Sequence, residues 1–140
     1  MPIQVEIFHF DRLVVGIGRG VVTLPEYGKF IGDLIQQGLM HYRKIIDVTS
    51  VESSPINKEV LLAFEERLKE YSKTRRGPLA VVARHDRNEI AHAFKAITSR
   101  ERPIEIFGAI HEARAWLSRQ PVADIVTRPV ESPKPDEEQK

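Results

Sequence analysis

The N-terminal residues alternate between apolar and polar side chains, which is the pattern of a strand with one buried face. Residues 3–7 alternate in this way, and residues 13–17 form a second apolar run. Asp11 and Arg12 lie between the two runs as turn residues, so we expect the runs to pair as an antiparallel hairpin. Because the first run keeps a polar face, it is predicted to be an edge strand.

From Leu24 onward the apolar positions recur every three or four residues, which predicts an amphipathic helix. Thr23 and Glu26 have the spacing of a capping box, and Pro25 stands in the first turn. Gly38 is expected to end this helix.

The rest of the folded region alternates between short apolar runs and amphipathic stretches. The runs predict buried strands at residues 45–48, 79–83 and 104–107. The stretches predict helices over residues 55–72, from His85 or Asp86 to Ile97, and over 111–119. The order predicts an α/β fold: a mostly parallel five-stranded sheet with one antiparallel edge strand and four helices on its faces.

The last twenty residues have a different composition. Residues 121–140 contain four of the 9 prolines and many charges, so we expect a largely disordered tail after a single domain over residues 1–120. Within the tail, Ala123, Ile125 and Val126 could dock as a short extended piece, whereas disorder is expected beyond Arg128.

The composition narrows the class of protein. The 140 residues carry 21 basic and 20 acidic side chains, so a general affinity for nucleic acid is not indicated. The chain has no cysteine, which excludes disulfides, thiol nucleophiles and cysteine-ligated metals. No apolar run approaches the roughly 18 residues of a membrane span. We therefore expect a cytoplasmic globular protein without membrane insertion.

Two polar loops follow neighbouring buried strands, where ligands bind in open parallel sheets. Capping and turn chemistry explains the same residue types, so both interpretations stay open. The binding candidates from these two loops are Asp47, Thr49, Arg84, His85, Asp86 and Arg87.

The element order, with serines between a central strand and the next helix, resembles the STAS family, and most closely its SpoIIAA-like branch of small bacterial proteins. The stretches that carry the resemblance are residues 42–47, 77–83, 106–107 and 112–117. Together they imply the family's fold over about residues 3–119.

In STAS antagonists a serine of a D-S-S-G motif is phosphorylated at the start of the helix after the central strand. The corresponding residues here are Glu52, Ser53, Ser54 and Pro55, so the resemblance makes Ser53 and Ser54 phosphorylation candidates. A phosphate there would face the free N–H groups of a helix start. Ser54 as a plain N-cap, followed by Pro55, explains the same residues without a kinase.

One glycine pattern and one histidine pattern have simpler explanations than a ligand site. The dinucleotide-binding fingerprint G-x-G-x-x-G would need its third glycine at position 21, where this chain has valine. Gly16, Gly18 and Gly20 are therefore interpreted as strand glycines. His85, Glu89 and His92 would share one helix face, which we expect to be solvated rather than to bind a metal.

The basic residues of the opposite loops lack interleaved aromatic side chains, so we interpret them as surface charges rather than nucleic-acid contacts. They are Lys73, Arg75, Arg76, Arg100 and Arg102.

No G-x-S-x-G nucleophile elbow occurs, so no catalytic residues are predicted, and no cofactor or metal. The resemblance implies a non-enzymatic regulatory or binding module that acts on another protein. The alternative is a domain that binds a small apolar or anionic ligand at the carboxyl ends of the strands. A homodimer through the edge strand or the Ile125 region is a further expectation.

Overall fold

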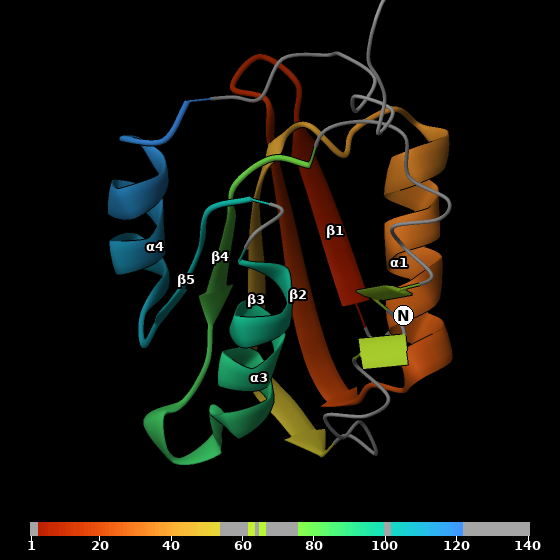
Figure 1. The fold of residues 1–140 in the computed structure, drawn as a ribbon, viewed down its shortest axis with the longest axis vertical. Coiled ribbons are helices and arrows are strands. Elements are labelled where there is room, and N and C mark those ends of the chain that lie inside the picture. The colour runs from red at the N-terminus through yellow and green to blue at the C-terminus, as the bar shows by residue number, and fades with distance from the viewer. Residues whose placement is uncertain (1–2, 54–61, 64, 67–75, 100–101, 122–140) are drawn as a thin grey trace, which may run out of the picture.

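The computed structural model describes residues 3–53, 62–63, 65–66, 76–99 and 102–121. Five strands form one sheet in the order β1-β2-β3-β4-β5 (Figure 1). The antiparallel pair is β1 with β2, and the remaining neighbours are parallel. The bounds are β1 Ile3–Phe8, β2 Leu13–Val21, β3 Arg43–Ser53, β4 Leu79–Val82 and β5 Ile104–Phe107. The predicted α/β sheet with one antiparallel edge strand is therefore confirmed.

The described helices are α1 (Leu24–Gln36), α3 (Glu89–Thr98) and α4 (Ile110–Leu117). Residues 62–63 and 65–66 are also helical, and the rest of the helix predicted over 55–72 lies outside the described residues. The predicted start of α1 is confirmed in detail, because the Thr23 backbone N–H and hydroxyl both donate to Glu26 Oε1, at 2.7 and 3.0 Å. Gly38 follows the helix with a φ of 73°, a conformation that glycine adopts without strain.

The period of two along the strands assigns each side chain to one face of the sheet. On β2, Val14 packs with Phe30 and Leu34 of α1, whereas Val15 packs with Ala113 of α4. On β4, Leu79 and Val81 pack against Ala91 and Phe94 of α3, and Ala80 and Val82 against α4. The sheet is thus covered by α1 and α3 on one face and by α4 on the other.

Two strands are longer than the sequence predicts. β2 reaches Val21 instead of residue 17, and β3 runs from Arg43 to Ser53 instead of 45–48. The polar residues after Val48 stay extended because they pair with the end of β2, a partner that local hydrophobicity does not reveal.

The glycines of β2 allow this close packing. A Cβ on Gly16 would lie 3.0 Å from Phe30 Cζ, and one on Gly18 would lie 2.9 Å from Val51 Cγ2. Both glycines are strand residues against which larger side chains pack, as the sequence indicated.

The loop before β4 crosses closely over the segment that follows α1. The Gly77 N–H donates to the Met40 carbonyl oxygen at 2.8 Å, and a Cβ on Gly77 would overlap the carbonyl oxygens of His41 and Tyr42. Within the described residues, no helix has both the length and the apolar character that a membrane crossing needs.

Gly77→Ala is expected to lower the free energy of unfolding by more than about 2 kcal/mol, because backbone atoms of the crossing segment must move apart. Gly32→Ala is the matched control, since Gly32 lies within α1 with open space around its Cα. That variant should gain about 1 kcal/mol from helix propensity. Urea denaturation measures both, and equal effects of the two variants would contradict the proposed overlap.

Candidate functional site

The two polar segments singled out in the sequence lie at one edge of the sheet. Asp47 of β3 pairs in register with Val82, the last residue of β4. The Ala83 N–H then donates to the Phe107 carbonyl oxygen at 2.9 Å, so β5 ends at the same level. In Figure 1 the loop from β4 into α3 and the end of β3 lie together at the lower end of the molecule. The structure therefore brings these segments to a shared rim.

Asp47 lies in β3, within the predicted strand, whereas Thr49 was expected after the strand and is also a residue of β3. Between Ile17 and Arg19 the β2–β3 register shifts, so that β3 carries one extra residue near this point. The Thr49 backbone N–H and hydroxyl donate to Asp47 Oδ1 at 2.9 and 2.7 Å. The carboxylate thus satisfies the backbone of the irregular turn, and this contact uses one of its oxygens.

Arg84 and Asp86 form an exposed ion pair just after β4. Arg84 Nε and Nη2 donate to the two carboxylate oxygens of Asp86 at 3.0 and 2.8 Å. This bidentate pair joins residues two positions apart, so the guanidinium is matched locally. Since both side chains are about half exposed or more, the pair presents polar groups to solvent at the rim.

The segment after Arg84 forms a 3₁₀ turn over His85–Arg87 before α3 begins at Glu89. The prediction that the helix opens at His85 or Asp86 was wrong for α3, because residues 85–87 form a separate 3₁₀ turn and the α-helix begins at Glu89. His85 consequently does not share an α-helical face with Glu89 and His92, although all three are exposed. Among the residues that the structure describes, no group of three or more His, Cys, Asp or Glu could hold a metal ion.

The serine candidates sit at the margin of the described chain. Ser53 is the last residue of β3 and pairs in register with Val21. Ser54, Pro55 and the start of the following helix lie outside the described residues, as does the side chain of Arg87. The phosphorylation prediction for Ser53 and Ser54 therefore stays a prediction.

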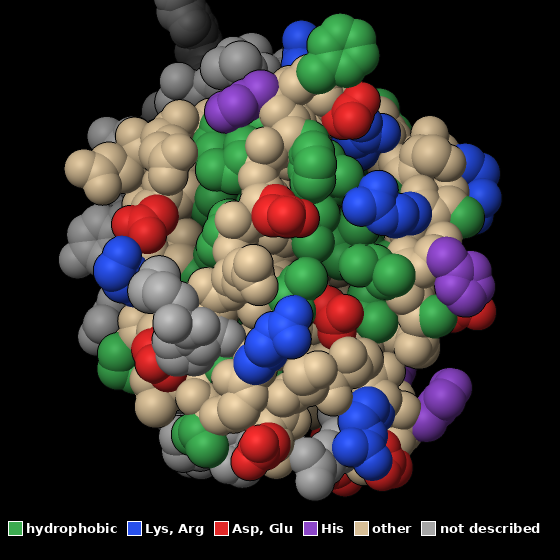
Figure 2. Space-filling model, turned by 180° about the vertical axis from the view of Figure 1, so that it is seen from behind, with side chains coloured by type: hydrophobic (Ala, Val, Ile, Leu, Met, Phe, Trp, Pro, Cys, Tyr) green, Lys and Arg blue, Asp and Glu red, His purple; other side chains and the backbone are tan. Residues whose placement is uncertain are grey.

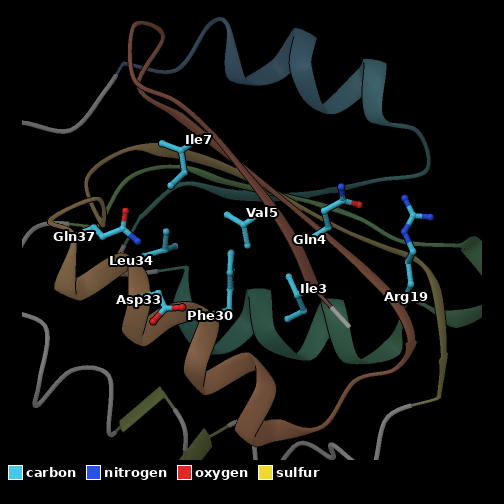
Figure 3. A pocket seen from close by; sticks show the side chains of 9 residues that line it. All are labelled: Ile3, Gln4, Val5, Ile7, Arg19, Phe30, Asp33, Leu34 and Gln37. Atoms are coloured by element: carbon cyan, nitrogen blue, oxygen red, sulfur yellow. The ribbon is translucent and has the colours of Figure 1, made fainter. Parts of the chain in front are cut away.

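A cavity lies elsewhere, along the first strand. It has a volume of about 530 Å³ and opens between β1 and α1 (Figure 3). Ile3, Val5 and Ile7 face Phe30 and Leu34 across it. Neither Asp47 nor Arg84 is among its lining residues, so this cavity is not the ligand pocket that the alternative function places at the rim.

The comparisons with known proteins bear on the fold. No protein-family model matches the chain, and no curated protein matches it in sequence. An uncharacterized DUF3478-family protein from Shewanella loihica, whose fold is described as SpoIIAA-like, matches with a TM-score of 0.55 and 16% identity over 82% of this chain and 91% of its own. An anti-sigma factor antagonist from Mycobacterium paratuberculosis matches with a TM-score of 0.56 and 17% identity, over 83% of this chain and 92% of its own.

The chain has a SpoIIAA-like fold. The resemblance predicted from the sequence is thus confirmed at the level of the fold. The matched share of each chain shows that the likeness extends over the whole domain and is not confined to one β-α unit.

The end of this SpoIIAA-like sheet opposite the rim holds a cluster of buried charges that the sequence did not predict. Arg76 and Arg102 were interpreted as surface charges, but only 3% and 7% of their surfaces are exposed. Arg76 forms a two-pronged ion pair with the equally buried Glu65, in which Nη2 donates to Oε1 at 3.0 Å and Nη1 donates to Oε2. The Arg102 guanidinium lies 5.7 Å from the centre of the Phe94 ring.

Lys44 of β3 completes this buried cluster. Its Nζ donates to the carbonyl oxygens of Met40 and Tyr42 at 2.6 and 2.9 Å, and the side chain is almost fully buried. Burial in the core lowers the pKa of Lys44 well below its ordinary value of 10.5, and the charges of Arg102 and Arg76 lower it further. One feature of the sequence could have indicated this burial. Lys44 directly precedes a run of apolar strand residues, and a lysine at the start of a buried strand needs hydrogen-bond acceptors inside the protein.

The lowered pKa of Lys44 predicts a pH dependence of stability. The unfolded chain binds a proton on Lys44 up to about pH 10.5, whereas the folded chain releases it at lower pH. The unfolded state therefore holds more protons in this interval, and stability rises with pH through it. Relative to Lys44→Met, the wild type should gain up to about 1.4 kcal/mol per pH unit as the pH approaches 10.

Urea denaturation of the wild type and Lys44→Met between pH 7 and pH 10 measures this difference. Lys29→Met serves as the control, because Lys29 carries an exposed ammonium paired with Asp33 on α1. If the free energies of unfolding of the wild type and Lys44→Met change in parallel with pH, the pKa of Lys44 is not lowered and the prediction is wrong.

Proposed function

We propose that the protein is a non-enzymatic regulatory module of the bacterial cytoplasm that acts by binding another protein at the rim. The fold shared with an anti-sigma factor antagonist over 83% of the chain carries this proposal. A protein-binding role suits a chain whose sequence contains no assembled catalytic motif.

The surface of the rim supports a protein partner. Ile90 is 38% exposed in the first turn of α3, and Val21 is 54% exposed at the end of β2, beyond the level of Asp47. Arg84, Asp86 and Glu89 surround the start of the same helix and are exposed as well. Exposed apolar groups within a polar border are typical of protein interfaces.

The contacts of the rim favour a protein partner over a small anion. Arg84 is one of the predicted binding candidates, but its guanidinium already donates to both carboxylate oxygens of Asp86. Asp47 Oδ1 likewise accepts two hydrogen bonds from Thr49. A small anion at Arg84 would compete with the Asp86 carboxylate, whereas a protein surface can add contacts around these local bonds.

Affinity capture from a bacterial lysate tests this function. The wild-type protein should retain a defined protein, and Arg84→Glu with Ile90→Asp should reduce its recovery at least about tenfold, because the contact surface changes charge and loses an apolar group. Arg114→Glu on the exposed side of α4 is the matched charge control and should retain the partner. Equal recovery with all three proteins would place the contact elsewhere, and no retained protein would refute the proposal.

We further propose that phosphorylation at Ser53 or Ser54 weakens this contact, because about −1.5 to −2 charges would be added at the end of β3. Ser53→Asp with Ser54→Asp should reduce recovery of the captured protein, whereas the double alanine variant should not. Native mass spectrometry of the protein purified from its own host would show the added mass of a phosphate. Unchanged capture by the aspartate variant would refute the switch and leave the rim contact intact.

A further inference from the structure

The free edge of β1 lacks the features that usually protect an edge strand. On one side β1 pairs with β2 through a continuous register from Ile3 to Phe8, and within the described residues no strand pairs with its other side. Its sequence contains neither proline nor lysine and has one charge, Glu6. Unprotected edges of this kind accept further strands.

An apolar groove runs alongside this edge. Val5, which lines the groove, remains 39% exposed. The 530 Å³ cavity between β1 and α1 has an apolar centre, with polar groups at its margin that include Gln4, Asp33 and Gln37 (Figure 3). Seen from behind, the molecule also has hydrophobic side chains at its surface, between acidic and basic ones (Figure 2). An extended chain beside β1 could bond to its backbone and place alternate side chains in this groove.

The C-terminal segment of the chain starts near the turn that follows β1. Arg43 Nη1 donates to the carbonyl oxygen of Leu117, the last residue of α4, at 3.3 Å. Its Nη2 donates to the carbonyl oxygen of Asp11 at 2.6 Å. One guanidinium therefore joins the end of α4 to the turn that follows β1. A chain that continues from α4 along β1 would run from Phe8 toward Ile3, antiparallel to the strand.

The sequence of this segment suits a strand. Residues 122–128 lie between Pro121 and Pro129 and contain no proline, so each residue can donate a backbone hydrogen bond. Ala123, Ile125 and Thr127 would share one face of such a strand and Val122, Asp124, Val126 and Arg128 the other, and Pro129 would end the pairing. This is the one stretch of the last twenty residues with strand character.

We propose that residues 124–128 pair with the free edge of β1 as an antiparallel sixth strand, with Ile125 and Thr127 in the groove against α1. The segment needs no partner molecule, because it follows α4 in the same chain. This inference does not depend on the function proposed for the rim.

Charges select the register of this pairing. If Ile125 were opposite Val5, Asp124 would lie opposite Glu6, and like charges opposite one another are destabilising. A shift of two residues keeps the same faces and places Ile125 opposite Ile7.

In the shifted register no like charges lie directly opposite one another. Asp124 then lies opposite Phe8 and Arg128 lies opposite Gln4, so both are diagonal to Glu6, one with the same charge and one with the opposite charge. Thr127 lies opposite Val5, so small and branched side chains line the groove. Opposite charges in diagonal positions remain within reach of long side chains.

A second copy of the chain fits this edge less well. Two β1 strands paired about a two-fold axis in one continuous sheet keep the same faces aligned. Each copy would then place its own α1 beside the shared edge on the same face. Because α1 lines the groove next to β1, the two helices would compete for one space.

Cysteine pairs test the register in the full-length chain, which contains no cysteine of its own. Val5→Cys with Thr127→Cys should form an intramolecular disulfide at least about tenfold faster than Val5→Cys with Ser132→Cys, because the docked strand raises the local concentration of residue 127. Equal rates would overturn the proposal. A disulfide-linked dimer from Val5→Cys with Thr127→Cys would also overturn it, in favour of a second copy.

Amide hydrogen exchange tests the docking without cross-links. Ile125→Asp should accelerate exchange of the β1 amides at least about tenfold, since a charge cannot enter the groove and the added strand is lost. Val130→Asp is the matched control, because Val130 follows Pro129 and lies beyond the proposed strand. If exchange in β1 is the same in both variants and the wild type, the tail does not cover the edge.

Discussion

The parallel pairing of β3 between β2 and β4 is the constraint on which the rest of the structure depends. This pairing sets the level at which Asp47 meets Val82 and thereby brings the polar segments after both strands to one rim. The same register assigns the faces of the sheet, so that Lys44 points toward the α1 and α3 side and Ile45 toward α4. A shift of one residue in β3 would exchange these two side chains and place an ammonium under α4.

This register buries Lys44, which is energetically unfavourable, and hydrogen bonds to backbone carbonyl oxygens compensate for it. An ammonium removed from water is disfavoured unless its donors are satisfied. Here the carbonyl oxygens of Met40 and Tyr42 accept its hydrogen bonds, in a segment that Gly77 crosses at close range. The buried pair of Arg76 and Glu65 lies among the same charges. Such groups add little net stability, but the loss of one partner from a buried pair costs about 3–5 kcal/mol, so together they fix one arrangement of this end.

The two ends of the sheet therefore differ in how their charged side chains are placed. At one end charges are buried and bonded within the fold, which suits a structural role. At the other end Arg84 and Asp86 are exposed beside Ile90, which suits contact with a partner. The open side of β1 is a third feature, separate from both, and its backbone groups rather than its side-chain charges make it a place for an added strand.

The sequence by itself determined the element order, the antiparallel edge strand and the start of α1, because these follow from local periodicity and from capping by residues three positions apart. It also placed Asp47 and Arg84 at one rim, since strands joined by helices run parallel. It did not determine that Arg76 and Arg102 are buried, because burial depends on elements distant in the chain. Nor did it determine the length of β3, whose polar end is extended only where the end of β2 supplies hydrogen-bond partners. Tertiary contacts decided both, because the same residues without these neighbours would be solvated loop residues.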